Sequence, residues 1–152
     1  MSVEEIFDHL PFTNHLDISV THADEGYAEG NLKLDSDKHS SNPRRMIAHG
    51  AVPFALADTV GGAAVVSLNQ APAPTVDMRI DYIKPATSDL YAEANVERFG
   101  DSSAVVDIEV LDDEYIEVAK VRGVYKVSGF KEDSPHKWHE KDIEDAGIDL
   151  DR

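Results

Sequence analysis

One apolar stretch dominates the chain: GAVPFALADTVGGAAVVSL, from Gly50 to Leu68, holds a single charged residue, Asp58. Its 19 residues approach the length of a membrane span. A carboxylate in the middle of a span would be costly in lipid, however, and Pro53 falls in the first turn of a helix, where a missing N–H costs nothing. Apolar residues occupy nearly the whole circumference, so other elements should enclose the helix. We therefore predict a core helix of a soluble protein without membrane association.

The segments before this helix predict a short helix and a hairpin. Ser2 can cap a helix, with Glu5 at the spacing of a capping box, and Pro11 ends it. Apolar residues then alternate with polar ones, which indicates strands separated by an acidic turn. The expected elements are a helix over residues 2–9, strands over 16–20 and 27–34, and a loop over 35–45.

After the apolar stretch the period of the apolar residues changes to two, which is typical of strands. Short turn sequences with several acidic residues separate the runs. Such turns usually join antiparallel neighbours, so we expect consecutive strands to pair with each other. The four expected strands cover residues 75–82, 90–99, 104–110 and 116–127.

This order of elements predicts a single domain of the α+β class over residues 1–127. One antiparallel sheet of about six strands would wrap the apolar helix. Residues 128–152 form a polar, mainly acidic tail, in which 138–146 could be helical. We expect a peripheral or partly disordered appendage rather than a catalytic element.

The chain has 152 residues and a net charge of −16, from 30 acidic and 14 basic side chains. Such a surface repels phosphate backbones, so no nucleic-acid partner is expected. The charge can serve solubility by self-repulsion, or adaptation to high salt, where screening makes an acidic surface tolerable. There is no cysteine, which excludes disulfides, thiolate metal sites and cysteine nucleophiles. The histidine spacings predict no metal site, and the acidic start resembles no signal peptide, which favours a cytoplasmic protein.

Two features of the apolar stretch point to chemistry. The first is the pair His49-Gly50 at the mouth of the helix, where N–H groups lack internal partners and the helix dipole is positive. Gly50 lets a substrate oxygen approach its N–H closely, as in an oxyanion hole, although an ordinary helix start also suits a glycine. The second is Asp58, because an ionised carboxylate among apolar neighbours is costly unless it is paired.

Burial raises the pKa of a carboxylate, which makes it a better general base near neutral pH. Asp58 is therefore a candidate base, and the alternative is a structural carboxylate bonded to the backbone or to Thr59. Gly50 and Asp58 are eight residues apart on one helix, or about 12 Å. A base and an oxyanion donor must both lie within about 3 Å of the atoms that they serve. If both act on one substrate, two antiparallel helices across a twofold axis must supply them.

These residues resemble the PaaI-type acyl-CoA thioesterases of the hotdog superfamily, over about Leu16 to Val127. The resemblance rests on the His-Gly pair, on the aspartate nine residues after the histidine, and on the run Thr75-Val76-Asp77-Met78 before a strand that ends at Tyr82. It implies a central helix wrapped by an antiparallel sheet, a homodimer whose sheets join, and often a homotetramer. It also implies hydrolysis of an acyl-CoA thioester to a free acid and CoA, without a cofactor.

The resemblance also assigns roles. Asp58 would be the base or nucleophile, Gly50 would polarise the thioester carbonyl, and His49 would orient the site. Thr75 falls where the family has a serine or threonine that positions the attacking water, and Asn42 resembles a loop asparagine that assists carbonyl binding. Two departures concern the oxyanion hole: Ala51 replaces the usual second glycine, and Asn42 lies one residue further from the histidine than usual.

The phosphates of CoA need local cations on so acidic a protein. The candidates are Arg44, Arg45, Lys84, Lys120 and Arg122, and each could equally be an isolated surface charge. Three other functions stay open: a non-catalytic acyl-CoA or ligand-binding hotdog protein, a hotdog enzyme of the enoyl-CoA hydratase type, and a structural oligomer. In the hydratase signature, Ser40 replaces the aspartate and Arg45 replaces the histidine.

Overall fold

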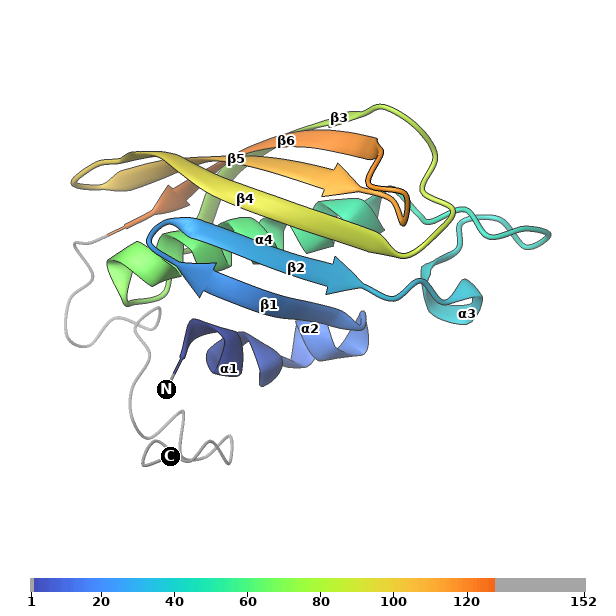
Figure 1. The fold of residues 1–152 in the computed structure, drawn as a ribbon, viewed down its shortest axis with the longest axis horizontal. Helices are drawn as coiled ribbons and strands as arrows, with labels where there is room; N and C mark the ends of the chain where they lie inside the picture. Colours follow the sequence, from blue (N-terminus) through green and yellow to red (C-terminus); the bar gives the residue numbers. More distant parts are fainter. Residues whose placement is uncertain (1, 128–152) are drawn as a thin grey trace.

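A computed structural model describes residues 2–127 and shows one antiparallel sheet wrapped around one long helix (Figure 1). The six strands of this sheet lie in the order β1-β2-β4-β5-β6-β3. The predicted α+β class, with a sheet around an apolar helix, is confirmed. The strands are β1 Ile18–Asp24, β2 Tyr27–Leu32, β3 Thr75–Tyr82, β4 Leu90–Phe99, β5 Ser103–Leu111 and β6 Glu117–Lys126; the helices are α1 Val3–Asp8, α2 Pro11–His15, α3 Ser36–His39 and α4 Ala51–Asn69.

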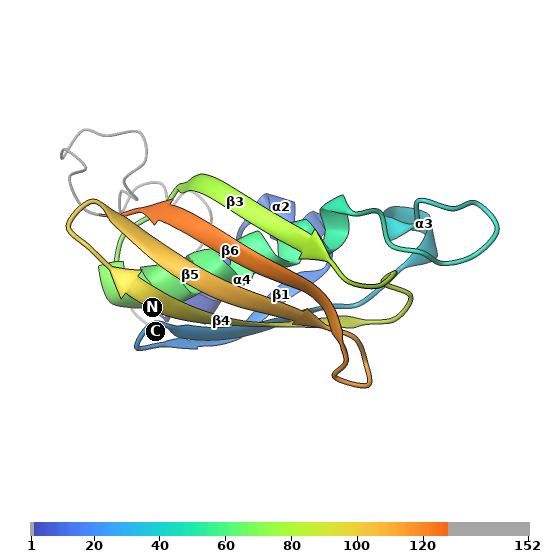
Figure 2. The ribbon, with the colours of Figure 1, turned by 90° about the horizontal axis from the view of Figure 1, so that it is seen from above.

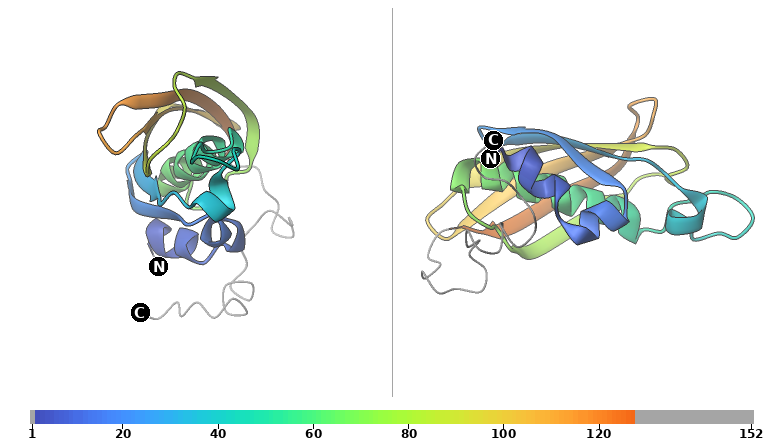
Figure 3. Two further views of the ribbon diagram at one scale, coloured as in Figure 1. Left: turned by 90° about the vertical axis from the view of Figure 1, so that its right-hand side faces the viewer. Right: turned by 90° about the horizontal axis from the view of Figure 1, so that it is seen from below.

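Helix α4 forms the core, as its sequence predicts. It begins after Gly50, has Pro53 in its first turn, and ends at Gln70 in the left-handed region with a φ of 52°. An end-on view shows the sheet curling around it (Figure 3). Among the described residues α4 is the helix long and apolar enough to cross a membrane, but most of it is enclosed. It is therefore the core helix of a soluble fold.

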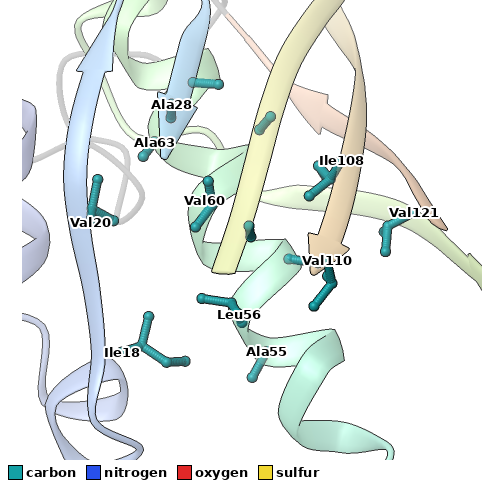
Figure 4. Packing of buried hydrophobic residues seen from close by; sticks show 14 of the residues in the cluster. Ile18, Val20, Ala28, Ala55, Leu56, Val60, Ala63, Ile108, Val110 and Val121 are labelled. Atoms are coloured by element: carbon teal, nitrogen blue, oxygen red, sulfur yellow. The ribbon is translucent and has the colours of Figure 1, made fainter. Parts of the chain in front are cut away.

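The core is built from one face of the sheet against the helix. Leu56 and Val60 of α4 lie between residues of β1 and β2 on one side and residues of β5 and β6 on the other (Figure 4). All of the labelled side chains in that view are buried. Gly30 of β2 is needed for this fit, because a Cβ there would lie 2.5 Å from a methyl group of Val60.

The N-terminal segment has one helix more than the sequence predicts. The capping box is confirmed, since Ser2 accepts the Glu5 N–H at 3.2 Å and the Glu5 carboxylate accepts the Ser2 N–H at 2.8 Å. Pro11, however, begins α2 instead of only ending α1, because proline fits the first position of a helix. Both helices contact β1 and cover that edge of the sheet.

Two further expectations are corrected. The predicted loop over residues 35–45 contains the short helix α3, which Asp35 caps by accepting the Asp37 N–H at 2.8 Å. Strand β3 does not pair with β4, its neighbour in sequence; it crosses to the far edge of the sheet and pairs with β6 (Figure 2). The segment between β3 and β4 is longer than a tight turn. It therefore does not force these two strands to pair, as a tight turn would.

The edge made by β3 carries apolar side chains in contact with solvent. Val76 is 64% exposed, and Tyr82 and Ile83 are each 53% exposed. An uncovered edge strand also presents unpaired backbone groups to another chain. The predicted tail over residues 128–152, with its helix over 138–146, lies outside the described residues.

Replacing Leu56 with alanine tests the enclosed helix. Leu56 is fully buried, so the substitution leaves a cavity and should lower the free energy of unfolding by about 2–5 kcal/mol. Leu68→Ala on the same helix is the matched control, because Leu68 is 40% exposed and should cost much less. Urea denaturation measures both, and equal losses would contradict the packing.

Candidate active site

The first turn of α4 leaves one backbone N–H available. The ring of His49 accepts the Ala51 N–H at Nδ1, at 3.0 Å, and the His49 carbonyl accepts the Val52 N–H at 2.8 Å. Within residues 2–127 the Gly50 N–H meets no acceptor. Because Nδ1 is an acceptor, a neutral His49 ring carries its proton on Nε2. The helix start therefore offers the Gly50 N–H as a hydrogen-bond donor beside the exposed His49 ring.

Tyr82 holds the Gly50 peptide from the end of β3. Its hydroxyl donates to the Gly50 carbonyl oxygen at 2.6 Å. A Cβ on residue 50 would lie 3.2 Å from that hydroxyl, so a glycine keeps the contact unstrained. Partial burial of the hydroxyl raises the pKa of the Tyr82 phenol, although 53% of the residue is exposed, and the hydroxyl stays protonated at neutral pH. This bond fixes the orientation of the peptide that joins Gly50 to Ala51.

A buried histidine fixes the approach to the helix. His39 is 1% exposed, accepts the Asp35 N–H at Nδ1 at 2.9 Å, and donates from Nε2 to the Leu16 carbonyl at 2.9 Å. Its own carbonyl accepts the His49 N–H at 2.7 Å. The histidine thereby ties the residue before Gly50 to α3 and to the chain entering β1.

Asp58 is half-buried, not enclosed as the apolar sequence around it predicts. Its Oδ1 accepts the Thr75 hydroxyl at 2.6 Å and the Tyr125 hydroxyl at 3.2 Å. Thr59, the alternative structural partner, donates instead to the Ala55 carbonyl at 2.7 Å. None of the ion pairs within residues 2–127 includes Asp58. Two hydroxyl groups, and no cation, are therefore the side-chain partners of this carboxylate in the described chain.

A cleft of about 380 Å³ opens beside the start of α4. Its lining is mainly apolar and includes Ile47, Pro53, Ile83 and Val118, together with Gly50. An acyl or pantetheine chain is the kind of group that such walls can hold. The cleft brings an apolar surface next to the free N–H.

Lys84 also lines this cleft, and it is already paired. Its Nζ lies 2.6 Å from Oδ2 of Asp112, whose other oxygen accepts the N–H groups of Glu114 and Ile116, each at 2.9 Å. The Lys84 ammonium and these N–H groups hold the pKa of the Asp112 carboxyl below its usual value. Lys84 is therefore paired with Asp112 in this structure, and its role in substrate binding stays a prediction.

The loop between α3 and α4 extends beyond the end of the sheet (Figure 1). Asn42 lies there, and its side-chain oxygen accepts the N–H groups of Arg44 at 2.9 Å and Arg45 at 3.3 Å. Both arginines are exposed. The described chain does not bring these three residues to Asp58 by any contact, so their roles in substrate binding stay predictions. Within residues 2–127 no group of three or more histidine or acidic side chains could hold a metal ion.

Three residues of the site were missed from the sequence: Tyr125, Tyr82 and His39. For Tyr125 a signal was present, because glycines inside a helix and inside a strand often mark the close approach of a bulky group. For Tyr82 and His39 no spacing rule relates them to Gly50, since both contacts depend on the tertiary fold. Thr75, in contrast, was predicted, and it contacts Asp58.

Comparison with known proteins defines the family. The thioesterase superfamily model matches residues 46–119. A Halobacterium salinarum protein named as a candidate esterase is 30% identical over 141 residues, which cover 86% of this chain and 92% of that protein. This chain belongs to the thioesterase superfamily, and its sheet and helix are those of the hotdog thioesterases.

Two solved structures of comparable similarity have the same fold. One is an X-ray structure of a thioesterase-superfamily protein, 32% identical, with a TM-score of 0.77 over 83% of this chain and 96% of that one. The other is the E. coli PaaI protein from the phenylacetic acid degradation operon, 27% identical, with a TM-score of 0.73 over 82% of this chain and 88% of that one. The predicted resemblance to the PaaI-type family is thereby confirmed.

Acid titration tests the pair beside the cleft. The lowered pKa of Asp112 adds stability above the ordinary aspartate pKa, and this contribution disappears as the pH falls through the lowered value. Lys84→Met should therefore lower the melting temperature at pH 7, and the difference from wild type should shrink below about pH 4. Arg122→Met is the control, because its pair with Asp107 spans 3.9 Å between exposed groups. A Lys84→Met difference that stays constant down to pH 2 would contradict this assignment.

Proposed function

We propose that this protein hydrolyses acyl-CoA thioesters, with Asp58 as general base and the Gly50 N–H as oxyanion donor. One observation carries the proposal: the carboxylate of Asp58 is held by the Thr75 hydroxyl at 2.6 Å, while Gly50, whose N–H is unpaired within residues 2–127, lines an apolar cleft at the start of the same helix. Membership of the thioesterase superfamily supports this type of activity. The acyl and pantetheine parts of the substrate would occupy the cleft.

The site would be completed by a second copy of the chain. Gly50 and Asp58 are about 12 Å apart along α4, too far to serve one carbonyl. The two ends of β3 each contact one of them, since Thr75 binds Asp58 and Tyr82 binds Gly50. If two β3 strands pair antiparallel about a twofold axis, the Thr75 end of one lies beside the Tyr82 end of the other. Each site then combines Asp58 of one chain with Gly50 of its partner.

The exposed edge of β3 supports this homodimer. Its apolar side chains and unpaired backbone groups are those that strand addition would cover. Joining the two sheets at β3 leaves the outer faces free, so a homotetramer would need a further contact.

Hydrolysis then proceeds in two steps. The Gly50 N–H donates to the thioester oxygen and stabilises the oxyanion that forms when water attacks the carbonyl carbon. Asp58 takes a proton from that water as the C–O bond forms, and Thr75 holds the carboxylate in place. Collapse of the tetrahedral intermediate breaks the C–S bond, and the proton passes to the leaving CoA thiolate. The His49 ring accepts the neighbouring Ala51 N–H, so the Gly50 N–H is the donor that remains at this turn.

The other functions are less well supported. In the hydratase signature, Ser40 stands in the aspartate position, and its hydroxyl donates to the Asn42 carbonyl within the loop. A non-catalytic binding protein would keep the cleft, but it would have no use for a half-buried carboxylate that two hydroxyl groups hold.

The exposed Arg44 and Arg45 would meet CoA phosphates from the loop next to the site.

Asp58→Asn tests the base. The substitution keeps the shape of the side chain and removes the proton acceptor, so kcat should fall by about 10² to 10⁴-fold while the melting temperature changes little. Asp113→Asn is the control, since Asp113 is an exposed residue of the β5–β6 turn. Turnover is measured by CoA release from aromatic, short-chain and long-chain acyl-CoAs. A folded Asp58→Asn protein with wild-type turnover would refute the assignment.

Subunit complementation tests the shared site. Gly50→Pro removes the N–H donor at a φ of −54°, which proline adopts, and Asp58→Asn removes the base. Co-expressed in equal amounts, the two inactive variants should recover about a quarter of the wild-type sites, because half of the dimers are mixed and each mixed dimer has one complete site. Activity no higher than that of the separate variants would place both groups in one chain.

A further inference from the structure

We propose that Tyr125 is a positioning residue for Asp58: it holds one carboxylate oxygen so that the other faces the attacking water. This inference rests on the proposed function, since it concerns the same base. Tyr125 lies on β6, far from Asp58 in sequence, and is 1% exposed.

The contacts are specific to the carboxylate and its helix. The Tyr125 hydroxyl lies 3.0 Å from the Asp58 carbonyl oxygen and 3.2 Å from Oδ1. The Thr75 hydroxyl donates to the same Oδ1 at 2.6 Å. Within residues 2–127 Oδ2 receives no side-chain or backbone donor. The two hydroxyls thus fix one oxygen from two strands and leave the second oxygen available for proton transfer.

Two glycines make room for the tyrosine. A Cβ on Gly61 would lie 2.5 Å from the Tyr125 hydroxyl oxygen, and a Cβ on Gly123 would lie 2.7 Å from its ring. At Gly62 a Cβ would lie 3.6 Å from the ring, which is an ordinary van der Waals contact. A glycine lowers the stability of a helix interior, and a glycine also weakens a strand. These costs fall at Gly61 and Gly123, the two positions where a larger residue would collide with Tyr125.

The tyrosine can only donate in this arrangement. Burial, together with the nearby Asp58 charge, raises the pKa of the Tyr125 phenol well above its usual value. The hydroxyl therefore keeps its proton over the whole working pH range, and its bond to Oδ1 persists. A carboxylate that loses such a donor is less stabilised in its charged form.

Tyr125→Phe tests the role. It keeps the ring in the space that the glycines provide and removes only the hydroxyl. We expect kcat to fall by about 10- to 100-fold, the rate equivalent of one hydrogen bond to a charged group, with KM nearly unchanged. The ascending limb of the pH profile of kcat should move to higher pH, which loss of packing alone would not produce.

The matched control is Tyr27→Phe. Tyr27 also donates to a carboxylate, that of Glu29, at 2.6 Å, but on β2, away from α4's first turns and from the cleft. Its loss should leave kcat and the pH profile as in wild type. Both hydroxyls bind one oxygen, so their effects on kcat should be coupled. The loss of kcat in the double variant Tyr125→Phe/Thr75→Val should therefore differ from the product of the two single losses, and a loss equal to that product would contradict the coupling.

The outcomes separate this inference from the proposed function. If Asp58→Asn is inactive while Tyr125→Phe keeps the wild-type kcat and pH limb, the positioning role is wrong and the base stands. If the wild-type protein hydrolyses no acyl-CoA of the panel, the proposed function is wrong, and crystal structures of wild type and Tyr125→Phe then decide the inference. A single Asp58 rotamer in wild type and several in the variant would support it, whereas the same single rotamer in both would overturn it.

Discussion

A helix without a polar face is the constraint on which this fold depends. Helix α4 has buried residues on nearly every side, so it is stable only when the sheet surrounds it. A flat sheet could cover one side alone, and this sheet instead curls around the helix (Figure 3). The exception is the side that carries Asp58, which is turned toward β3 and β6 and is only partly covered. The same enclosure that forms the core therefore leaves the Asp58 carboxylate only partly covered.

Strand β3 connects that opening to the start of the helix. If β3 paired with β4, as neighbours in sequence usually do, it would lie in the middle of the sheet. Its place at the far edge beside β6 puts Thr75 against Asp58 and Tyr82 against Gly50. Among the strands of residues 2–127, none pairs with the outer side of β3. One topological step thus sets the contacts of Asp58 and Gly50 within a chain and exposes the edge through which we propose that a second chain completes the site.

The sequence predicts most of the fold because its signals are local. The apolar run, the capping box of Ser2 and Glu5, and the alternation of the strands depend on neighbours a few residues apart. The extra helix at Pro11 and the short helix capped by Asp35 were not predicted, since four or five residues give too little periodicity. The placement of β3 was wrong because pairing between distant strands is decided by the whole sheet.

The same limit applies to the site: residues marked by a local pattern could be predicted, and those placed by distant contacts could not. Asp58 stands out as the only charge in an apolar run, and Gly50 as the glycine at the mouth of the helix, so the sequence alone is enough to propose both as site residues. Thr75 followed from the family resemblance and not from periodicity. Tyr125 was missed, because it appears in the sequence as one more core residue of a strand, and the glycines that accommodate it indicate a close approach without identifying the residue that makes it.

The hydroxyl partners of Asp58 suit the role of base that we propose for it. An arginine or lysine beside a carboxylate strongly favours its charged form, so the carboxylate accepts a proton less readily. A hydroxyl group orients the carboxylate and satisfies one oxygen with a smaller effect of this kind. On a chain with a net charge of −16, the cations of residues 2–127 that form ion pairs do so elsewhere, as Lys84 does with Asp112. Within residues 2–127 Asp58 thus has neutral donors and no cation beside it, an arrangement that would hold the proposed base in position and leave it able to take a proton.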